Sequence, residues 1–315
     1  MDGMSPNPII ITGPTGSGKS DLAIKIAKDL SGEIISVDSM QVYKGMDVGT
    51  AKVSKKEQMT VPHHMIDICS VVEEFDVAKF IDKASKLYQE IFERGRVPIF
   101  CGGTGLYLKA FFQGIGTAPP KDAELRKNLE KLTLEELQII LKSEAPSTFN
   151  YIDKDNPRRL IRAIEIVRLT GRPPKDLKSP WDQNISNWPK CVYVMQPELE
   201  DHLKKMEQRV DKMLENGLVE ETSRLIDEGI LQNHSAAQAI GYRQIISYLQ
   251  GDTELQDAVE SIKIKTRQFA KRQRTWFRNQ MPPSQILPSS DPLEAKNFIL
   301  NHYQDKQPGM TTRGG

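Results

Sequence analysis

The sequence predicts an α/β fold in which a parallel sheet has helices on both faces and a mainly helical segment is inserted between two of its strands. Up to about residue 116, short apolar runs alternate with stretches of helical spacing, which is the pattern of βαβ units. Residues 121–170 then contain helical patterns without strands, and an apolar run at 192–195 resumes the strand pattern. An insertion between strands of one sheet is the simplest account of this order.

Residues 1–116 are predicted to form the first part of the core. Its strands are expected at 8–12, 33–37 and 97–101, where continuous apolar runs are typical of strands buried in a parallel sheet. Helices are expected at 20–30 and 74–95, because apolar residues recur there every three or four positions.

The helical insertion is expected to span residues 117–190, beginning at the breaker Pro119-Pro120. Residues 191–304 would form the second part of the core, with a strand at 192–195, a helix at 201–216 and a basic C-terminal helix. The inward residues of the 201–216 helix would be Leu203, Met206, Val210, Met213 and Leu214. Residues 305–315 are polar and end in glycine, which predicts a disordered tail.

Composition excludes several classes of protein. The chain has 315 residues, of which 38% are hydrophobic and 27% are charged, as in ordinary globular proteins. It has no window of about 18 consecutive apolar residues, so no membrane span is expected, and its acidic N-terminal start does not fit a signal peptide. Its three cysteines are far apart in the sequence, which predicts a reduced, cytoplasmic protein without a disulfide framework.

One motif carries a specific chemistry. Residues 13–20, Gly13-Pro14-Thr15-Gly16-Ser17-Gly18-Lys19-Ser20, match G-x-x-x-x-G-K-[ST] between a predicted strand and a predicted helix. In this P-loop, backbone N–H groups surround phosphate oxygens, Lys19 supplies a positive charge and Ser20 can bind Mg²⁺. The core is therefore predicted to be P-loop NTPase-like and to bind a phosphorylated ligand, without specifying ATP or GTP.

Two further sites follow predicted strands at the edge where open α/β sheets bind ligands. Asp38 follows the second strand and could act as a general base or bind a metal, or it could cap a turn through Asp38-Ser39. Residues 102–105 (GGTG) follow the third strand, where glycines permit close approach of the backbone and Thr104 offers a hydroxyl. A simple βα turn explains these residues about as well.

Taken together, the motifs resemble the tRNA dimethylallyltransferase (tRNA isopentenyltransferase) family from about residue 8 to about residue 276. The resemblance rests on residues 13–20, 36–52 (SVDSMQVYKGMDVGTAK), 62–64 (PHH), 102–104 (GGT), 155–159 (DNPRR), 162–165 (RAIE), 241–244 (GYRQ) and 266–273 (TRQFAKRQ). The chain lacks a Cys-x-x-Cys pair that could begin a C-terminal zinc finger, which is consistent with the bacterial type.

The resemblance implies transfer of a dimethylallyl group from dimethylallyl diphosphate to N6 of the adenine 3′ of the anticodon, in tRNAs that read codons beginning with U. It implies that Asp38 takes the N6 proton and that Thr104 hydrogen-bonds the leaving oxygen. Lys19, Ser20 with Mg²⁺, and Arg243 would neutralise the diphosphate. A phosphate loop suits this role because it stabilises charge that develops on a departing diphosphate.

The same resemblance implies that the protein, expected to be a monomer, binds the anticodon stem-loop of tRNA. The target base would leave the stack and contact Thr104 and the turn formed by Asp38, Ser39, Met40 and Gln41. The helical insertion would then be a tRNA-binding domain, with its contacts at Arg126, Arg162, Ala163, Ile164, Glu165 and Ile166. Without the resemblance, Arg162 would be assigned to a solvated helix face.

Positive charge is concentrated between residues 263 and 278, where seven Lys and Arg occur with no acid, while the rest of the chain is acidic by six charges. On a helix, one narrow face would carry Lys263, Arg267, Lys271, Arg274 and Arg278, and another would carry Val259, Ile262, Phe269, Ala270 and Phe277. The first face would bind RNA phosphates, so Arg267, Lys271, Arg272 and Arg274 are predicted RNA contacts. Trp276 is assigned to the core in preference to base stacking. A merely solvated face is the alternative for the basic segment.

Three other functions fit parts of the sequence. A P-loop small-molecule kinase would use Asp38 to activate a hydroxyl, but no arginine-bearing lid is evident. An isopentenyltransferase acting on free AMP, ADP or ATP would not need the basic face. An RNA-binding protein with a degenerate nucleotide fold would not need an intact phosphate loop.

Overall fold

The computed structural model describes residues 7–177, 188–281, 286–287 and 291–306. The chain divides into two compact units, the first comprising Met1–Leu108 with Trp188–Gly315 and the second comprising Lys109–Asn187. The second unit therefore begins and ends earlier in the chain than the insertion expected at 117–190. Of the tail expected at 305–315, Asp305 is the last residue of a helix, and residues 307–315 lie outside the described residues.

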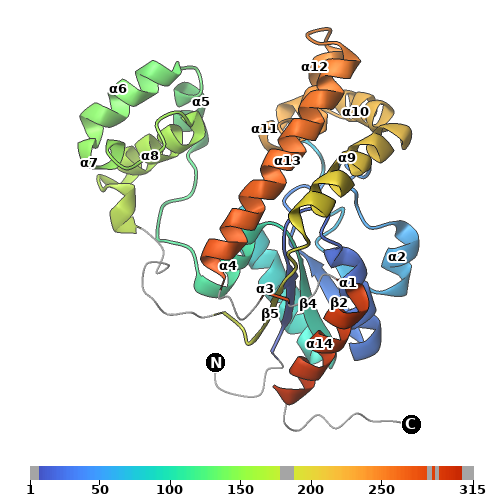
Figure 1. Ribbon diagram of the computed structural model, residues 1–315. Coiled ribbons are helices and arrows are strands. Elements are labelled where there is room, and N and C mark those ends of the chain that lie inside the picture. Colours follow the sequence, from blue (N-terminus) through green and yellow to red (C-terminus); the bar gives the residue numbers. More distant parts are fainter. Residues whose placement is uncertain (1–6, 178–187, 282–285, 288–290, 307–315) are drawn as a thin grey trace. The chain divides into compact units, whose positions relative to one another are not determined.

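The first unit contains a parallel sheet in the strand order β3-β2-β4-β1-β5 (Figure 1). Its strands are β1 (Ile9–Thr12), β2 (Gly32–Ser36), β3 (His63–His64), β4 (Val97–Gly102) and β5 (Cys191–Val194). The four longer strands confirm the sequence prediction, and β5 pairs with β1 although the helical unit separates them in the chain. β3 is a two-residue edge strand that the hydrophobic pattern did not predict.

Helices cover both faces of the sheet, as predicted. Because strand residues alternate between faces, Ile9 and Ile11 of β1 pack in one cluster with α1 (Lys19–Leu30) and α14 (Pro292–Asp305). On the other face, α3 (Val77–Glu93) contacts β2 and β4, with the rings of Tyr88 and Phe100 6.2 Å apart. The strands are therefore buried on both sides, and ligands can approach only at their ends.

A second group of helices follows β5 in the chain. It comprises α9 (Leu199–Glu215), α10 (Leu218–Asp227), α11 (His234–Ala237), α12 (Tyr242–Leu249) and α13 (Leu255–Gln280). Helix α13 packs on α9 and α12, and α12 also packs on α10. Of the five residues expected to face inward from α9, Met206 and Val210 are buried and the other three are half-buried. Helix α2 (Lys55–Thr60) is short and precedes β3.

The second unit contains α5 (Ala123–Leu129), α6 (Leu134–Glu144), α7 (Pro146–Phe149) and α8 (Pro157–Thr170), and α4 (Gly105–Gln113) spans the boundary between the units. Between residues 109 and 177, all of which are described, there is no strand. Its own core includes Leu129, Leu137, Leu141, Leu160 and Ile164, all at most 1% exposed. The unit thus has an interior of its own and does not depend on the sheet for one.

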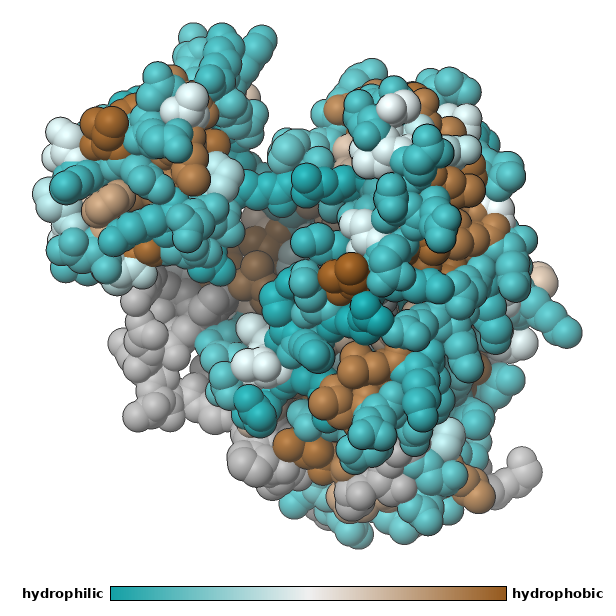
Figure 2. Space-filling model, turned by 45° about the horizontal axis from the view of Figure 1, so that its top comes forward, coloured by the Kyte–Doolittle hydropathy of each residue, from teal (hydrophilic) through white to brown (hydrophobic). Residues whose placement is uncertain are grey.

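Hydrophilic residues predominate on the face of the molecule drawn in Figure 2. On the face drawn in Figure 2, hydrophobic residues occur in small groups separated by hydrophilic ones. No helix within the described part of the chain combines the length and the apolar character needed to cross a bilayer.

Candidate active site

The three predicted ligand-binding segments lie together at the carboxyl ends of neighbouring strands. The phosphate loop follows β1, residues 102–105 close β4, and Asp38 follows β2, in the spatial order β2-β4-β1. Hydrogen bonds tie the strand ends to one another: Thr12 Oγ1 donates to the carbonyl of Gly102 at 2.8 Å, and Thr104 N donates to the carbonyl of Val37 at 3.2 Å. A ligand held by the phosphate loop is therefore within reach of all three segments.

Gln273 of α13 joins two of these segments, a role that the sequence did not reveal. Its buried amide accepts a hydrogen bond from Thr15 N at 2.8 Å and donates to the carbonyl of Gly103 at 2.9 Å. A Cβ at Gly103 would lie 2.6 Å from Gln273 Nε2, so a larger residue there would displace the Gln273 amide. Helix α13 thus helps to fix the phosphate loop.

Lys19 lies buried at the start of α1, with its ammonium group donating to the carbonyl of Pro14 at 2.7 Å. The pKa of Lys19 is lowered to about 8, chiefly by burial and also by the nearby Arg209 guanidinium, while Cys101 and Asp38 oppose the shift. The site therefore already holds two neighbouring cations, which an incoming polyanion would stabilise.

Arg209 of α9 is the cation that sequence reasoning missed. Burial lowers the pKa of Arg209 and the Asp38 carboxylate opposes this shift, so the guanidinium belongs to the same electrostatic group as Lys19 and Asp38. Its Nη2 donates to the carbonyl of Thr50 at 3.2 Å.

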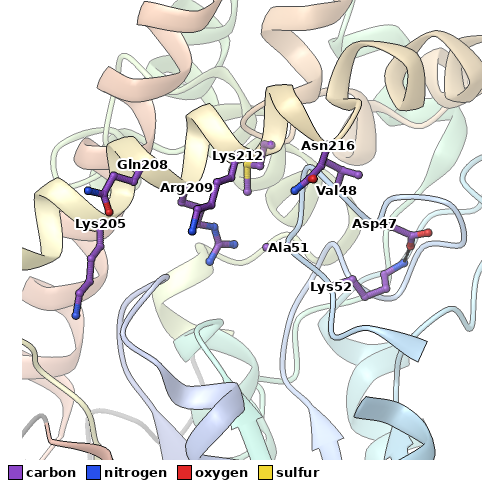
Figure 3. A pocket seen from close by; sticks show the side chains of 10 residues that line it. Asp47, Val48, Ala51, Lys52, Lys205, Gln208, Arg209, Lys212 and Asn216 are labelled. Carbon is purple, nitrogen blue, oxygen red and sulfur yellow. Dashed lines mark hydrogen bonds and ion pairs between the residues drawn. The ribbon is translucent and has the colours of Figure 1, made fainter. Parts of the chain in front are cut away.

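A pocket of about 590 Å³ lies beside Arg209. It is lined from α9 by Lys205, Gln208, Arg209, Lys212, Met213 and Asn216, and from the 47–52 loop by Asp47, Val48, Ala51 and Lys52. Figure 3 shows Lys205, Arg209 and Lys212 emerging from one helix, with the Arg209 guanidinium directed toward Ala51. Lys52 is paired with Asp47 and Asp67 at 2.6 Å each, so the positive charge available to a ligand comes from α9.

The Asp38 side chain caps a turn through one carboxylate oxygen and leaves the other oxygen without a partner in the described chain. Its Oδ1 accepts hydrogen bonds from Met40 N at 2.8 Å and Gln41 N at 3.2 Å, so the side chain does cap the 38–41 turn. Within the described chain, Oδ2 has no hydrogen-bond partner, and the residue is half-buried. One oxygen is therefore structural and the other is free to accept a proton.

The other residues predicted to contact the base differ in whether their polar side-chain groups already have hydrogen-bond partners. Gln41 accepts a hydrogen bond from Ser36 Oγ at 3.3 Å and donates to Thr50 O at 3.4 Å, so its amide is already engaged. Ser39, Met40 and Thr104 are half-buried, and in the described chain the Thr104 hydroxyl has no partner. The Thr104 hydroxyl is therefore a freer hydrogen-bond donor than the Gln41 amide.

Arg243, predicted to neutralise diphosphate, is exposed on α12, which packs on α10 and α13. The preceding Tyr242 is buried against Gly49 and Glu221, and Arg243 faces solvent. The arginine that influences Lys19 and Asp38 is Arg209. The diphosphate role of Arg243 stays a prediction, and Arg209 is a second candidate for that role.

Two serines of the phosphate loop offer hydroxyl groups. Ser17 Oγ is buried and has no hydrogen-bond partner in the described chain, a costly state that a phosphate oxygen would relieve. Ser20, the predicted Mg²⁺ ligand, is an exposed residue in the first turn of α1. No cluster of three or more His, Cys, Asp or Glu side chains suited to a metal occurs among the described residues. A metal at Ser20 would thus take its other ligands from phosphate and water, as Mg²⁺ commonly does.

In the helical unit, the predicted tRNA contacts divide into two sets. Glu165 is fully buried and accepts hydrogen bonds from Arg126, Arg162 and Asp122 N at 2.7–2.9 Å. Burial opposes ionisation, but these hydrogen bonds hold the pKa of Glu165 below its usual value. Ala163, Ile164, Glu165 and Ile166 are at most 6% exposed, so their side chains pack inside the helical unit, and RNA contact at these positions stays a prediction. Arg126 and Arg162 remain partly exposed around Glu165.

The basic residues of α13 form two groups, one bonded to other parts of the protein and one exposed, and the sequence did not reveal this division. Lys263 pairs with Asp211 at 2.7 Å, Arg267 pairs with Glu207, and Arg274 donates to the carbonyl of Pro197 at 2.5 Å. Lys263 and Arg267 therefore hold α9, and Arg274 holds the segment just before it. The exposed basic residues are Lys265, Lys271, Arg272 and Arg278, which shifts the cationic surface of α13 away from α9.

The apolar face of α13 is confirmed for Ile262, Ala270 and Phe277, which are buried. Val259 is half-buried, whereas Phe269 is 39% exposed and lies 5.9 Å from the Arg272 guanidinium. Trp276 is half-buried, and its ring occupies the space that a Cβ at Gly105 would need.

Comparison with known proteins agrees with this site. Residues 41–280 match the IPP transferase family, and residues 7–74 match the isopentenyl transferase family. The tRNA dimethylallyltransferase of Anoxybacillus flavithermus is 40% identical over 308 residues, covering 96% of this chain and 98% of the relative. That of Geobacillus kaustophilus is 42% identical over 287 residues, covering 89% of this chain and 90% of the relative.

Solved structures show the same relationship. The tRNA isopentenylpyrophosphate transferase of Bacillus halodurans has a TM-score of 0.67 at 37% identity, covering 96% of this chain and 98% of that one. A eukaryotic dimethylallyltransferase that acts on tRNA has a TM-score of 0.73 at 25% identity, covering 98% of this chain and 82% of that one. The chain therefore belongs to the IPP transferase family, that of the bacterial tRNA dimethylallyltransferases, as its motifs predicted.

Proposed function

We propose that the protein transfers a dimethylallyl group from dimethylallyl diphosphate to N6 of the adenine 3′ of the anticodon in tRNAs reading codons that begin with U. The observation that carries this proposal is the grouping of Lys19 and Arg209 with Asp38, whose Oδ2 is free in the described chain. A diphosphate site beside a proton acceptor suits displacement of diphosphate by an amine. Membership of the family supports tRNA as the source of that amine.

In the proposed reaction, the bond between C1 of the dimethylallyl group and the diphosphate oxygen breaks as a bond forms between C1 and N6. Asp38 Oδ2 takes the proton that N6 loses, and diphosphate leaves with the electron pair of the broken bond. The Asx turn fixes the carboxylate through Oδ1, so the accepting oxygen has a defined position.

Charge that develops on the leaving diphosphate would be met by Lys19, Arg209, the Ser17 hydroxyl and the backbone N–H groups of the phosphate loop. Such preorganised donors are most effective where charge builds in the transition state. The Thr104 hydroxyl would donate to the leaving oxygen. We further propose that Ser20 holds Mg²⁺ together with the diphosphate, and the metal would supply additional positive charge when bound.

The tRNA anticodon stem-loop would contact the protein through three groups of residues. The flipped adenine would meet Asp38, Ser39, Met40 and Thr104, while Arg126 and Arg162 would meet the stem-loop from the helical unit. The exposed basic residues of α13 would bind phosphates. We also propose a monomer located in the cytoplasm, which is consistent with three buried free cysteines.

A panel of substrates tests this function. The protein is incubated with labelled dimethylallyl diphosphate and, separately, unmodified tRNA, AMP or ATP, and with γ-labelled ATP and no prenyl donor. We expect label only in tRNA, with N6-dimethylallyladenosine recovered after nucleoside digestion. Label in AMP or ATP would instead indicate an adenylate isopentenyltransferase, and release of γ-phosphate would indicate a kinase.

The exposed basic residues of α13 give a prediction of their own. Replacing Lys271 and Arg272 with glutamine should weaken tRNA binding and flatten the slope of log affinity against log salt by up to about 1.5, because each lost phosphate contact removes about 0.7–0.9 from it. Binding titrations between low and moderate salt measure the slope.

Lys25→Gln with Lys28→Gln is the matched control, since both lysines are exposed on α1 and the charge removed is the same. Glutamine preserves helix propensity, and circular dichroism checks the helix content. If the control flattens the slope as much as the α13 variant does, the effect is one of net charge and α13 is only a solvated face.

A further inference from the structure

Glu221 is a buried carboxylate of α10 that faces the backbone of the 47–49 loop. Its Oε2 accepts hydrogen bonds from Asp47 N at 3.1 Å and Val48 N at 2.8 Å, and its Oε1 accepts one from Gly49 N at 3.1 Å. The fourth donor is the hydroxyl of Tyr242, at 2.6 Å. The residue is only 8% exposed, so the carboxylate depends on these four donors for its solvation.

The four hydrogen bonds hold the loop in one conformation. Three successive N–H groups converge on one side chain, an arrangement that an extended loop could not adopt. Burial and the adjacent Glu221 raise the pKa of Tyr242, so the phenol keeps its proton and acts as the donor. Gly49 packs directly on the Tyr242 ring, where a Cβ would lie 2.5 Å from Cζ. Glu221, Tyr242 and the loop thus form one buried unit, which we call the Glu221 clamp.

The clamp reaches the proposed diphosphate site through the next residue of the chain. The carbonyl of Thr50 accepts a hydrogen bond from Arg209 Nη2 at 3.2 Å. Arg209 and the 47–52 loop also line the same pocket (Figure 3). A shift of the loop would therefore move the acceptor that orients the guanidinium, although Glu221 itself does not line the pocket.

We propose that Glu221 is a positioning residue, which fixes the 47–50 loop and through Thr50 orients Arg209 toward the diphosphate. This inference rests on the proposed function, because it assigns Arg209 to the leaving diphosphate. Glu221 touches neither substrate, and its contribution passes through the loop.

The test compares Glu221→Gln and Tyr242→Phe with Glu220→Gln, an exposed neighbour on the same helix. Glutamine offers one acceptor oxygen where the clamp uses two, so we expect Glu221→Gln to raise KM for dimethylallyl diphosphate and to lower kcat/KM by about tenfold. Tyr242→Phe should have a smaller effect in the same direction, since it removes one donor of four. The Kd for tRNA should not change in these variants. In Glu220→Gln, KM for dimethylallyl diphosphate and kcat/KM should also equal those of wild type.

A double-mutant cycle separates positioning from general loss of structure. If Glu221 acts through Arg209, the losses in pyrophosphate affinity caused by Glu221→Gln and Arg209→Lys should be non-additive by about threefold or more. Tyr242→Phe combined with Arg209→Lys carries the same test if Glu221→Gln does not fold, as judged by thermal unfolding.

Additive losses, or a change confined to tRNA affinity, would overturn the proposal. If wild-type protein transfers no dimethylallyl group to tRNA, the proposed function fails instead. Because the cycle is measured with pyrophosphate alone, the coupling between Glu221 and Arg209 can be judged whatever the acceptor proves to be.

Discussion

Asp38→Asn should lower kcat for dimethylallyl transfer to tRNA by about 10²–10⁴-fold, the usual contribution of a positioned general base. The asparagine Oδ1 can still accept the hydrogen bonds from Met40 N and Gln41 N that shape the turn. The other side-chain atom becomes an amide nitrogen, which cannot take the N6 proton. The expected loss therefore isolates the second oxygen, and the Kd for tRNA should stay within a few-fold of wild type. Single-turnover rates with labelled dimethylallyl diphosphate measure the loss in transfer rate.

Asp38→Ala is the informative companion, because it removes the turn hydrogen bonds and the base together. If Asp38 only caps the turn, Asp38→Asn should retain near-normal turnover while Asp38→Ala loses it. If Asp38 is the base, both variants should be slow, and Asp38→Ala should also show a lower unfolding temperature. The pair therefore distinguishes the two roles that the sequence left open.

The parts of this site that sequence analysis predicted are those defined by short stretches of chain. The phosphate loop is recognised because its glycines, Lys19 and Ser20 are contiguous and lie between a strand and a helix. Asp38 and Thr104 are found because the carboxyl ends of parallel strands share one edge, so a strand prediction also locates the residues that follow it. In each case the local pattern and the topology agree.

The parts that it missed depend on which helices pack together. Gln273 reaches Thr15 across 258 residues of chain, and no local signal distinguishes it from other glutamines of a basic helix. Arg209 lies on an amphipathic helix, and only the packing of that helix shows that its charge acts on Lys19.

Two other features of the packing, the pairing of basic residues on α13 and the burial of residues 163–166, could not be predicted from the sequence for related reasons. Glu207 and Asp211 neutralise part of the basic face of α13. Both acids are evident in the sequence, but their pairing with Arg267 and Lys263 is not. Ala163, Ile164 and Ile166 are buried by the packing of their own helical unit, which the resemblance alone could not show. Of residues 162–166, only Arg162 keeps a partly exposed side chain.

Lys19→Met should slow dimethylallyl transfer by about 10²–10³-fold, as expected when one preorganised group facing a developing charge is removed. It should also weaken binding of inorganic pyrophosphate, which isothermal titration measures without the acceptor. Methionine replaces the buried alkyl stem and removes the ammonium group. Lys28→Met, at an exposed position of the same helix, should leave both quantities unchanged.

The pH dependence of this effect provides a sharper test. In the free protein, burial lowers the pKa of Lys19 to about 8, and pyrophosphate binds preferentially to the charged ammonium form. Below pH 8 the ratio of wild-type to Lys19→Met affinity should therefore be at its largest. Above pH 8 binding must first protonate the amine, so the ratio should fall by up to about tenfold per pH unit. Taking the ratio cancels the titration of pyrophosphate itself, which is common to both proteins. A ratio that is large and constant from pH 7 to pH 9.5 would mean that the pKa of Lys19 lies above this range. A ratio near one throughout would mean that the Lys19 ammonium does not meet the diphosphate.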